Sequence, residues 1–229
     1  MTDYVNEFRQ EVNPVDKIKY FFKQSWLLIV ASFFFGLLIA AANASLEPRI
    51  IQNEKDKLNN LMKLLISDAN NFQIAVENAE ISGQKGKTET TNIYKALDKS
   101  GKIIGFAFVA SGPGFADKIK LVIAADAKFE KYLGFKVLAS NETPGFGSKI
   151  ALDDPQSDLD YVDQYKEAPT GKFELIKTGK VEAIEKIDDQ IVAISGATVT
   201  SEAVVKIFNT YTEQMKEILQ QNGLIGNGE

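Results

Sequence analysis

The chain contains neither cysteine nor histidine among its 229 residues. Without cysteine it can form no disulfide, offers no thiolate nucleophile and cannot ligate an iron–sulfur cluster. Without histidine it lacks a common haem ligand and the side chain that most readily exchanges protons near neutral pH. If electrons pass through this protein, a bound organic cofactor must therefore carry them.

A strong excess of charge of one sign is also missing. Lys and Arg number 26 and Asp and Glu number 31, which gives a formal net charge of −5. Because no basic stripe with interleaved aromatic residues is present, we expect no nucleic-acid partner. The acidic segment 153–168 has neither the spacing nor the internal glycine of an EF-hand calcium loop. We interpret it as a solvated face and expect no metal site.

Residues 24–46 carry no formal charge, and the stretch from Trp26 to Ala44 is almost wholly apolar. At about 1.5 Å per residue, a helix of this length crosses a hydrocarbon core of ~30 Å. We therefore predict one transmembrane helix over 24–46. A cleavable signal peptide is the alternative, because Ala42-Asn43-Ala44 resembles a cleavage site, but the apolar run is longer than a usual signal core and favours a retained anchor.

Basic residues are slightly more frequent before this span than after it. They are Arg9, Lys17, Lys19 and Lys23 on one side and Arg49, Lys55 and Lys57 on the other. This bias predicts a cytoplasmic N-terminal segment, 1–23, in the inner (cytoplasmic) membrane. The bulk of the chain would then lie on the periplasmic or extracellular side.

The remaining sequence predicts an α+β fold, with a twisted, mainly antiparallel sheet flanked by helices. We expect a helical connector and loop over 47–90 and a folded domain over 91–229. The domain would contain a hairpin around Asp98-Lys99-Ser100-Gly101, because apolar β-like runs flank this turn. Further strands are expected at 118–124, 133–139, 173–177, 181–187 and 191–194, and an amphipathic helix at 202–219.

The segment 195–201 links the last of these strands to the helix and consists of small and hydroxyl-bearing residues. Gly196 and Ala197 would let a bulky ligand approach the backbone closely. The free N–H groups and positive dipole end of a helix N-terminus also suit a phosphate. The alternative interpretation is that Thr200 or Ser201 simply caps the helix.

Two more glycine loops, 112–115 and 141–147, complete a pattern that resembles the FMN-binding domain family. Members of this family include the G subunit of Rnf-type electron-transport complexes and, next in similarity, the C subunit of sodium-translocating NADH:quinone oxidoreductases. The resemblance depends on the order and spacing of Gly112-Pro113-Gly114-Phe115, Glu142-Thr143-Pro144-Gly145-Phe146-Gly147 and Ser195-Gly196-Ala197-Thr198.

The resemblance implies one FMN, joined through its phosphate to Thr198 as a phosphoester by a flavin transferase. It assigns Thr143, Gly145 and Phe146 to the flavin ring, with Pro144 fixing the turn. Glu142 is expected to hold its loop by hydrogen bonds rather than to transfer protons, and no residue is expected to be catalytic. The full set of implied cofactor contacts is Ser195, Gly196, Ala197, Thr198, Thr200, Glu142, Thr143, Pro144, Gly145, Phe146, Gly147, Gly112, Gly114, Phe115 and Lys177. Lys177 has a simpler interpretation as a solvated side chain.

One position departs from the family pattern. In the family, the flavin transferase recognises an Asp three residues before the Ser of the Ser-Gly-Ala-Thr motif. Val192 occupies that position here. The function implied by the resemblance is electron transfer within a membrane ion-translocating ferredoxin:NAD+ oxidoreductase complex, with its other membrane and peripheral subunits as partners. The alternatives are the FMN subunit of a sodium-translocating NADH:quinone oxidoreductase and a flavin-free structural or assembly subunit.

Overall fold

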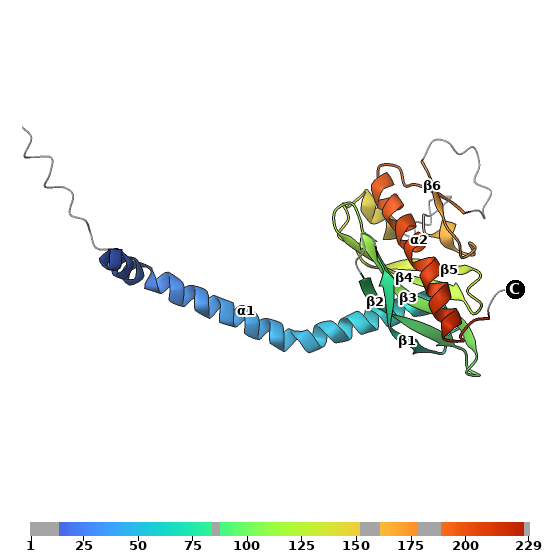
Figure 1. Cartoon of the computed structure of the whole chain (residues 1–229), viewed down its shortest axis with the longest axis horizontal. Helices are drawn as coiled ribbons and strands as arrows, with labels where there is room; N and C mark the ends of the chain where they lie inside the picture. Colours follow the sequence, from blue (N-terminus) through green and yellow to red (C-terminus); the bar gives the residue numbers. More distant parts are fainter. Residues whose placement is uncertain (1–13, 84–87, 152–160, 178–188, 227–229) are drawn as a thin grey trace, which may run out of the picture. The chain divides into compact units, whose positions relative to one another are not determined.

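The computed structural model describes residues 14–83, 88–151, 161–177 and 189–226. The chain divides into two compact units, Met1–Glu54 and Lys55–Glu229. A single helix, α1 (Pro14–Leu65), runs from the first unit into the second (Figure 1). The predicted span and the amphipathic helix expected after it therefore form one continuous element, which Pro48 does not interrupt.

The first unit contains the apolar part of α1. Its helix includes a window with a mean hydropathy of 2.3, none of which is buried, and it is long and apolar enough to cross a membrane. Large apolar side chains such as Trp26, Phe33 and Leu38 are exposed along it. In water this exposure would be unfavourable, so the composition and burial agree with the predicted transmembrane helix.

The second unit is built on a five-stranded antiparallel sheet in which each strand pairs with the next in sequence. Its strands are β1 (Asn71–Ser82), β2 (Thr88–Leu97), β3 (Ile103–Pro113), β4 (Lys118–Asp126) and β5 (Tyr132–Ala139). The predicted hairpin is confirmed. Oδ1 of Asp98 accepts hydrogen bonds from the N–H groups of Ser100 and Lys102, and Gly101 adopts a φ of +82°.

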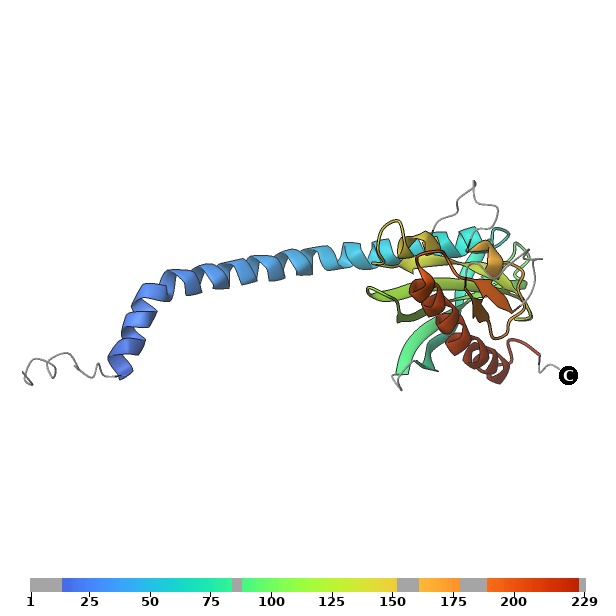
Figure 2. The same ribbon diagram turned by 90° about the horizontal axis from the view of Figure 1, so that it is seen from above.

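Two helices cover the two faces of this sheet (Figure 2). On one face, α2 (Thr198–Gln221) packs against the larger core; on the other, Met62 near the end of α1 packs against Ala107 and Val122. Side chains of β4 alternate between the two cores, as a pleated strand requires. The predicted α+β class with a mainly antiparallel sheet is confirmed.

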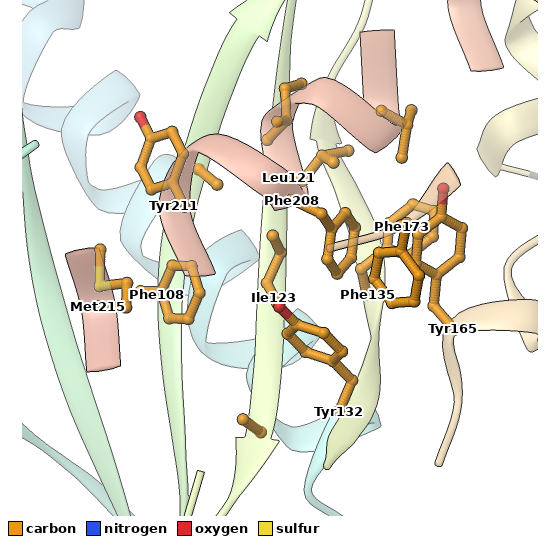
Figure 3. Close-up of a cluster of buried hydrophobic side chains, with 14 of the residues drawn as sticks. Phe108, Leu121, Ile123, Tyr132, Phe135, Tyr165, Phe173, Phe208, Tyr211 and Met215 are labelled. Atoms are coloured by element: carbon orange, nitrogen blue, oxygen red, sulfur yellow. The ribbon is translucent and has the colours of Figure 1, made fainter. Parts of the chain in front are cut away.

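An aromatic cluster anchors α2 to the sheet (Figure 3). Phe208 of α2 is fully buried, and its ring stacks on Tyr165 with centroids 4.5 Å apart. It also meets Tyr132 and Phe135 edge-to-face, with centroids 5.0 and 5.6 Å away. These geometries are the ones aromatic rings prefer, so they define the position of α2 on the sheet.

A short parallel pair, β6 (Glu174–Ile176) with β7 (Gln190–Val192), leads into α2. Short 3-10 helices cover Gly147–Ala151 and Asp163–Tyr165. The strand expected at 181–187 and the first half of the acidic segment, 153–160, lie outside the described residues.

The expectation of only helix and loop over 47–90 was wrong, because β1 and the start of β2 lie within it. The register of β1 against β2 shifts twice, between Ile74 and Val76 and between Val76 and Ala79. Such irregularities break the alternation by which a strand is recognised in a sequence.

Candidate functional site

The turn from β7 into α2 carries the small-residue segment. Gly196 has a φ of +79°, a conformation that favours glycine, and the N–H of Ala197 donates to the carbonyl oxygen of Ile194 at 3.0 Å. The helix begins at Thr198, whose side chain is half-buried, while Ser195 and Gly196 are exposed. The first-turn N–H groups of α2 have no acceptor within the helix, so this end can bind an anion.

Neither Thr200 nor Ser201 caps α2, so the capping alternative was wrong. Ala197 occupies the N-cap position and no side chain caps it. Ser201 Oγ instead accepts from the N–H of Ile194 and donates to the carbonyl oxygen of Ala197, both at 3.0 Å. It thereby ties Ile194, two residues after β7, to the N-cap of α2, a role that its position in the sequence did not reveal.

Tyr161 supports the same turn from the aromatic cluster. Its hydroxyl donates to the carbonyl oxygen of Ser201 at 2.9 Å. Burial raises the pKa of Tyr161 above its usual value, so the hydroxyl keeps its proton and remains a donor. The start of α2 is therefore held both by its own turn and by the core.

Glu142 joins the three glycine loops. Its side chain is only 5% exposed. Oε1 accepts from the N–H groups of Phe115 and Ala116 at 2.9 and 3.0 Å, and Oε2 accepts from the Thr200 hydroxyl at 2.6 Å. Glu142 thus makes hydrogen bonds, as expected, and its side chain makes them to the two other loops rather than within its own.

Two of the loop glycines make room for this carboxylate. A Cβ atom at Gly114 would collide with Oε1 of Glu142, and one at Gly147 would lie 2.7 Å from Oε2 and 2.7 Å from Oγ1 of Thr200. Gly112 differs from these, because it lies within β3 and pairs with Ile119. The family resemblance had assigned all three glycines to the cofactor.

The loop 143–147 folds into a tight turn that meets the turn before α2. The N–H groups of Phe146 and Ser148 both donate to the carbonyl oxygen of Thr143 at 3.2 Å, and Gly145 has a φ of +78°. The Phe146 ring is 56% exposed and lies close enough to Gly196 that a Cβ there would be 3.2 Å from it. Thr143 and Pro144 are exposed on the same turn.

Two candidate positions lie apart from these contacts. Lys177 follows β6 with an exposed side chain, and within the described part of the chain no hydrogen bond joins it to the three loops. Val192 lies in β7, where its N–H donates to Gln164 Oε1 at 2.7 Å and its carbonyl oxygen accepts from Nε2 at 3.2 Å. No sequence pattern identified Gln164 as the support of this strand.

The side chains around the three loops suit a ligand with a phosphate and a flat apolar ring. The first turn of α2 supplies backbone N–H donors and the Thr198 hydroxyl. Phe115, Phe146 and Val199 supply exposed apolar surface, with exposed fractions of 66%, 56% and 54%. FMN has both parts, so the residues present fit this group.

Comparisons with known proteins agree with this fit. A family model described as FMN-binding domain matches residues 114–213. The chain is similar to the G subunit of the proton-translocating ferredoxin:NAD(+) oxidoreductase complex of Clostridium ljungdahlii, with 27% identity over 82% of this chain and 88% of the relative. It is also similar to the G subunit of the ion-translocating oxidoreductase complex of Methanosarcina acetivorans, with 29% identity over 69% and 73% of the two chains.

A solved structure shares the fold. It is the C subunit of the Na(+)-translocating NADH-quinone reductase of Parabacteroides distasonis, which aligns with a TM-score of 0.50 and 17% identity over 79% of this chain and 98% of the other. The family match extends from the Gly114 loop through the Glu142 loop and the turn at Gly196 into α2, so it contains the whole hydrogen-bond network of Glu142. Residues 114–213 of the chain therefore resemble an FMN-binding domain.

Proposed function

We propose that this chain is the electron-transfer component of a membrane ion-translocating ferredoxin:NAD+ oxidoreductase complex of the Rnf type, and that it carries one FMN covalently bound to Thr198. The observation that carries the proposal is the position of Thr198 at the first residue of α2, in a turn that Glu142 links to both other glycine loops. The relatives from Clostridium ljungdahlii and Methanosarcina acetivorans support the same assignment.

The attachment needs no catalytic side chain from this chain. Attachment would form a bond between Oγ1 of Thr198 and the FMN phosphorus, and would break the bond from that phosphorus to a leaving group. Because a free phosphate is a poor electrophile, the donor must be a phosphoanhydride such as a flavin dinucleotide, which releases a nucleoside monophosphate. The hydroxyl proton passes to a base of the flavin transferase, which we propose as a partner.

Each loop then has a distinct part in holding the cofactor. The first-turn N–H groups of α2, with Ser195, Gly196 and Ala197 beside them, would stabilise the phosphate charge. Phe146, with Thr143, Pro144 and Gly145 of its turn, would contact the ring, and Phe115 would form a wall beside it. We keep Lys177 as a further candidate contact. FMN would supply the redox chemistry, and the protein would position it.

The membrane helix α1 indicates where in the cell the chain is located. We propose that α1 anchors the chain in the cytoplasmic membrane, with the FMN domain on the outer side and the other subunits of the complex as neighbours. Membership of a sodium-translocating NADH:quinone oxidoreductase is less well supported, because the likeness to a C subunit is one of fold. A flavin-free assembly protein is the remaining alternative, and Val192 is the residue that favours it.

Thr198→Val tests the proposal, since valine keeps the shape of threonine and removes the hydroxyl. We expect the full chain, produced with its flavin transferase, to gain the mass of one FMN and to show flavin fluorescence in a denaturing gel. Thr198→Val should lose both signals completely and Thr198→Ser should keep them. Thr210→Val, the same substitution on the same helix, is the matched control.

The outcomes separate the alternatives. Fluorescence that persists in Thr198→Val would overturn the attachment residue. A wild-type chain without added mass would favour the flavin-free assembly protein. In the purified complex, electron transfer from ferredoxin to NAD+, rather than from NADH to a quinone, would distinguish the two kinds of complex.

A further inference from the structure

We propose that Glu142 is the positioning residue for flavin attachment: it holds the first turn of α2 against the two other glycine loops and so presents the Thr198 hydroxyl outward. This inference rests on the proposed function. It goes beyond it by assigning the geometry of the attachment site to one buried carboxylate.

The contacts of Glu142 reach three separate parts of the chain. Its oxygens accept from Phe115, Ala116 and Thr200, which are 27, 26 and 58 residues away in sequence. All three donors are aimed at one side chain that is almost completely buried. Hydrogen bonds to an ionised acceptor are directional and stronger than neutral ones, so this group can fix the relative positions of the loops.

The bond to Thr200 determines which way Thr198 faces. An α-helix turns about 100° per residue, so residues two apart point to nearly opposite sides. Thr200 is buried against Glu142, whereas Thr198 is half-buried and Val199 between them is exposed. Holding Thr200 inward therefore turns Thr198 toward the outer side of the helix, where a transferase can reach it.

The Glu142 carboxylate also limits which backbone N–H groups can bind the phosphate. In the turn after β3, Phe115 and Ala116 have adjacent backbone N–H groups, an arrangement that can bind an anion. Here the N–H groups of Phe115 and Ala116 already bind Glu142 at 2.9 and 3.0 Å. The first turn of α2 is then the place left for the phosphate, which is where Thr198 lies.

Glu142 acts through these neighbours rather than on the flavin itself. Both of its oxygens are engaged, and the side chain is 5% exposed. Gly114 and Gly147 have no Cβ where one would displace this carboxylate. Two loops are thus shaped around Glu142, as expected for a residue whose function is to position others.

The test measures the rate of flavin attachment to the full chain by intact mass, with purified transferase and a flavin dinucleotide. We expect Glu142→Ala to slow attachment at least tenfold. Glu142→Gln should stay within about threefold of wild type, because its amide oxygen still accepts from the two N–H groups and its NH2 group can donate to Thr200. Glu89→Ala, which removes another carboxylate with three hydrogen-bond donors, is the matched control and should attach flavin normally.

A second measurement does not depend on flavin. In a Thr198→Val background, amide hydrogen exchange should rise at 114–117 and 195–201 in Glu142→Ala. In Glu89→Ala it should remain unchanged at 195–201, because the partners Ser111 and Lys118 of Glu89 lie beside 114–117 only. This separates loop positioning from a general loss of stability, which would raise exchange throughout the domain.

Several results would overturn the inference. Normal attachment and normal exchange in Glu142→Ala would do so, and so would a loss in Glu142→Gln as complete as in Glu142→Ala. If Glu142→Ala fails to fold, Thr200→Val removes the single bond to α2, and normal attachment in that variant would also exclude the positioning role. A wild-type chain that takes no flavin would overturn the proposed function instead, while the exchange measurement would still decide whether Glu142 orders the loops.

Discussion

At the scale of single residues, Glu89 is a second carboxylate that joins distant elements. Oε1 accepts from Lys118 Nζ at 2.7 Å, and Oε2 accepts from the hydroxyls of Ser111 and Tyr211. Partial burial acts to raise the pKa of Glu89, but the hydrogen bonds from Lys118, Ser111 and Tyr211 outweigh it and lower the pKa below its usual value. The pH dependence of stability should reflect this shift.

A carboxyl group whose pKa is lower in the folded state stabilises the fold above its unfolded-state pKa, and this contribution is lost as the pH falls through the folded-state pKa. Glu89→Gln should therefore lower the free energy of unfolding by about 1 kcal/mol at pH 7. The difference from wild type should shrink as the pH drops below the usual glutamate value of 4.5. Urea unfolding of the detergent-solubilised chain at pH 7 and at pH 3.5 measures both effects.

Glu130→Gln provides the control, because Glu130 is exposed in the turn between β4 and β5. It should change the free energy of unfolding by less than about 0.5 kcal/mol at either pH. A Glu89→Gln difference that grows as the pH falls would contradict the lowered pKa.

The candidate site shows which residue roles could be predicted from the sequence and which could not. Spacing and resemblance were enough to select Glu142 as a residue that holds its loop. They could not identify Phe115, Ala116 and Thr200 as its partners, because these become neighbours only when three loops meet. Gly114 and Gly147 were assigned to the cofactor for the same reason, since their closest contact is a side chain distant in sequence.

At the scale of elements, α2 connects the candidate site to the core. Its first turn carries Thr198, and ten residues later Phe208 lies fully buried among Tyr132, Phe135, Tyr165 and Phe173. Phe208→Ala should therefore lower the free energy of unfolding by about 3–5 kcal/mol, through lost burial and a new cavity. Chemical unfolding followed by circular dichroism measures this change.

Leu64→Ala in α1 is a suitable comparison, since Leu64 is exposed on the described surface of the folded domain. It should shift the same free energy by no more than about 0.5 kcal/mol. If Phe208→Ala cost less than about 1 kcal/mol, the aromatic cluster would not be what holds α2 on the sheet.

The elements also differ in how well they could be predicted from the sequence. β3, β4 and β5 were predicted because each contains a nearly continuous apolar run, as expected for a strand that is buried on both faces. β1 was missed because its side chains are mostly exposed and its register shifts twice. The helix α2 begins at Thr198, four residues before the predicted start at 202, because the motif residues that looked like a loop form its first turn.

At the scale of the whole molecule, the absence of cysteine makes the sidedness of the chain directly measurable. A single introduced cysteine is the only thiol, so a membrane-impermeant maleimide reports one position without background. Lys99 is well placed for this substitution, because it is exposed in the turn between β2 and β3, away from the three glycine loops. Thr2 provides the corresponding position in the N-terminal segment.

The bias of basic residues around the membrane helix predicts opposite results for these two positions. In intact spheroplasts Lys99→Cys should be labelled to near completion, whereas Thr2→Cys should be labelled only after the membrane is opened. The wild-type chain should take no label in either condition. If Thr2→Cys were labelled from outside while Lys99→Cys was protected, the domain would face the cytoplasm, and the proposed placement of the flavin outside the membrane would have to be reversed. The attachment at Thr198 and the role of Glu142 would remain as proposed, because both depend on contacts within the second unit alone.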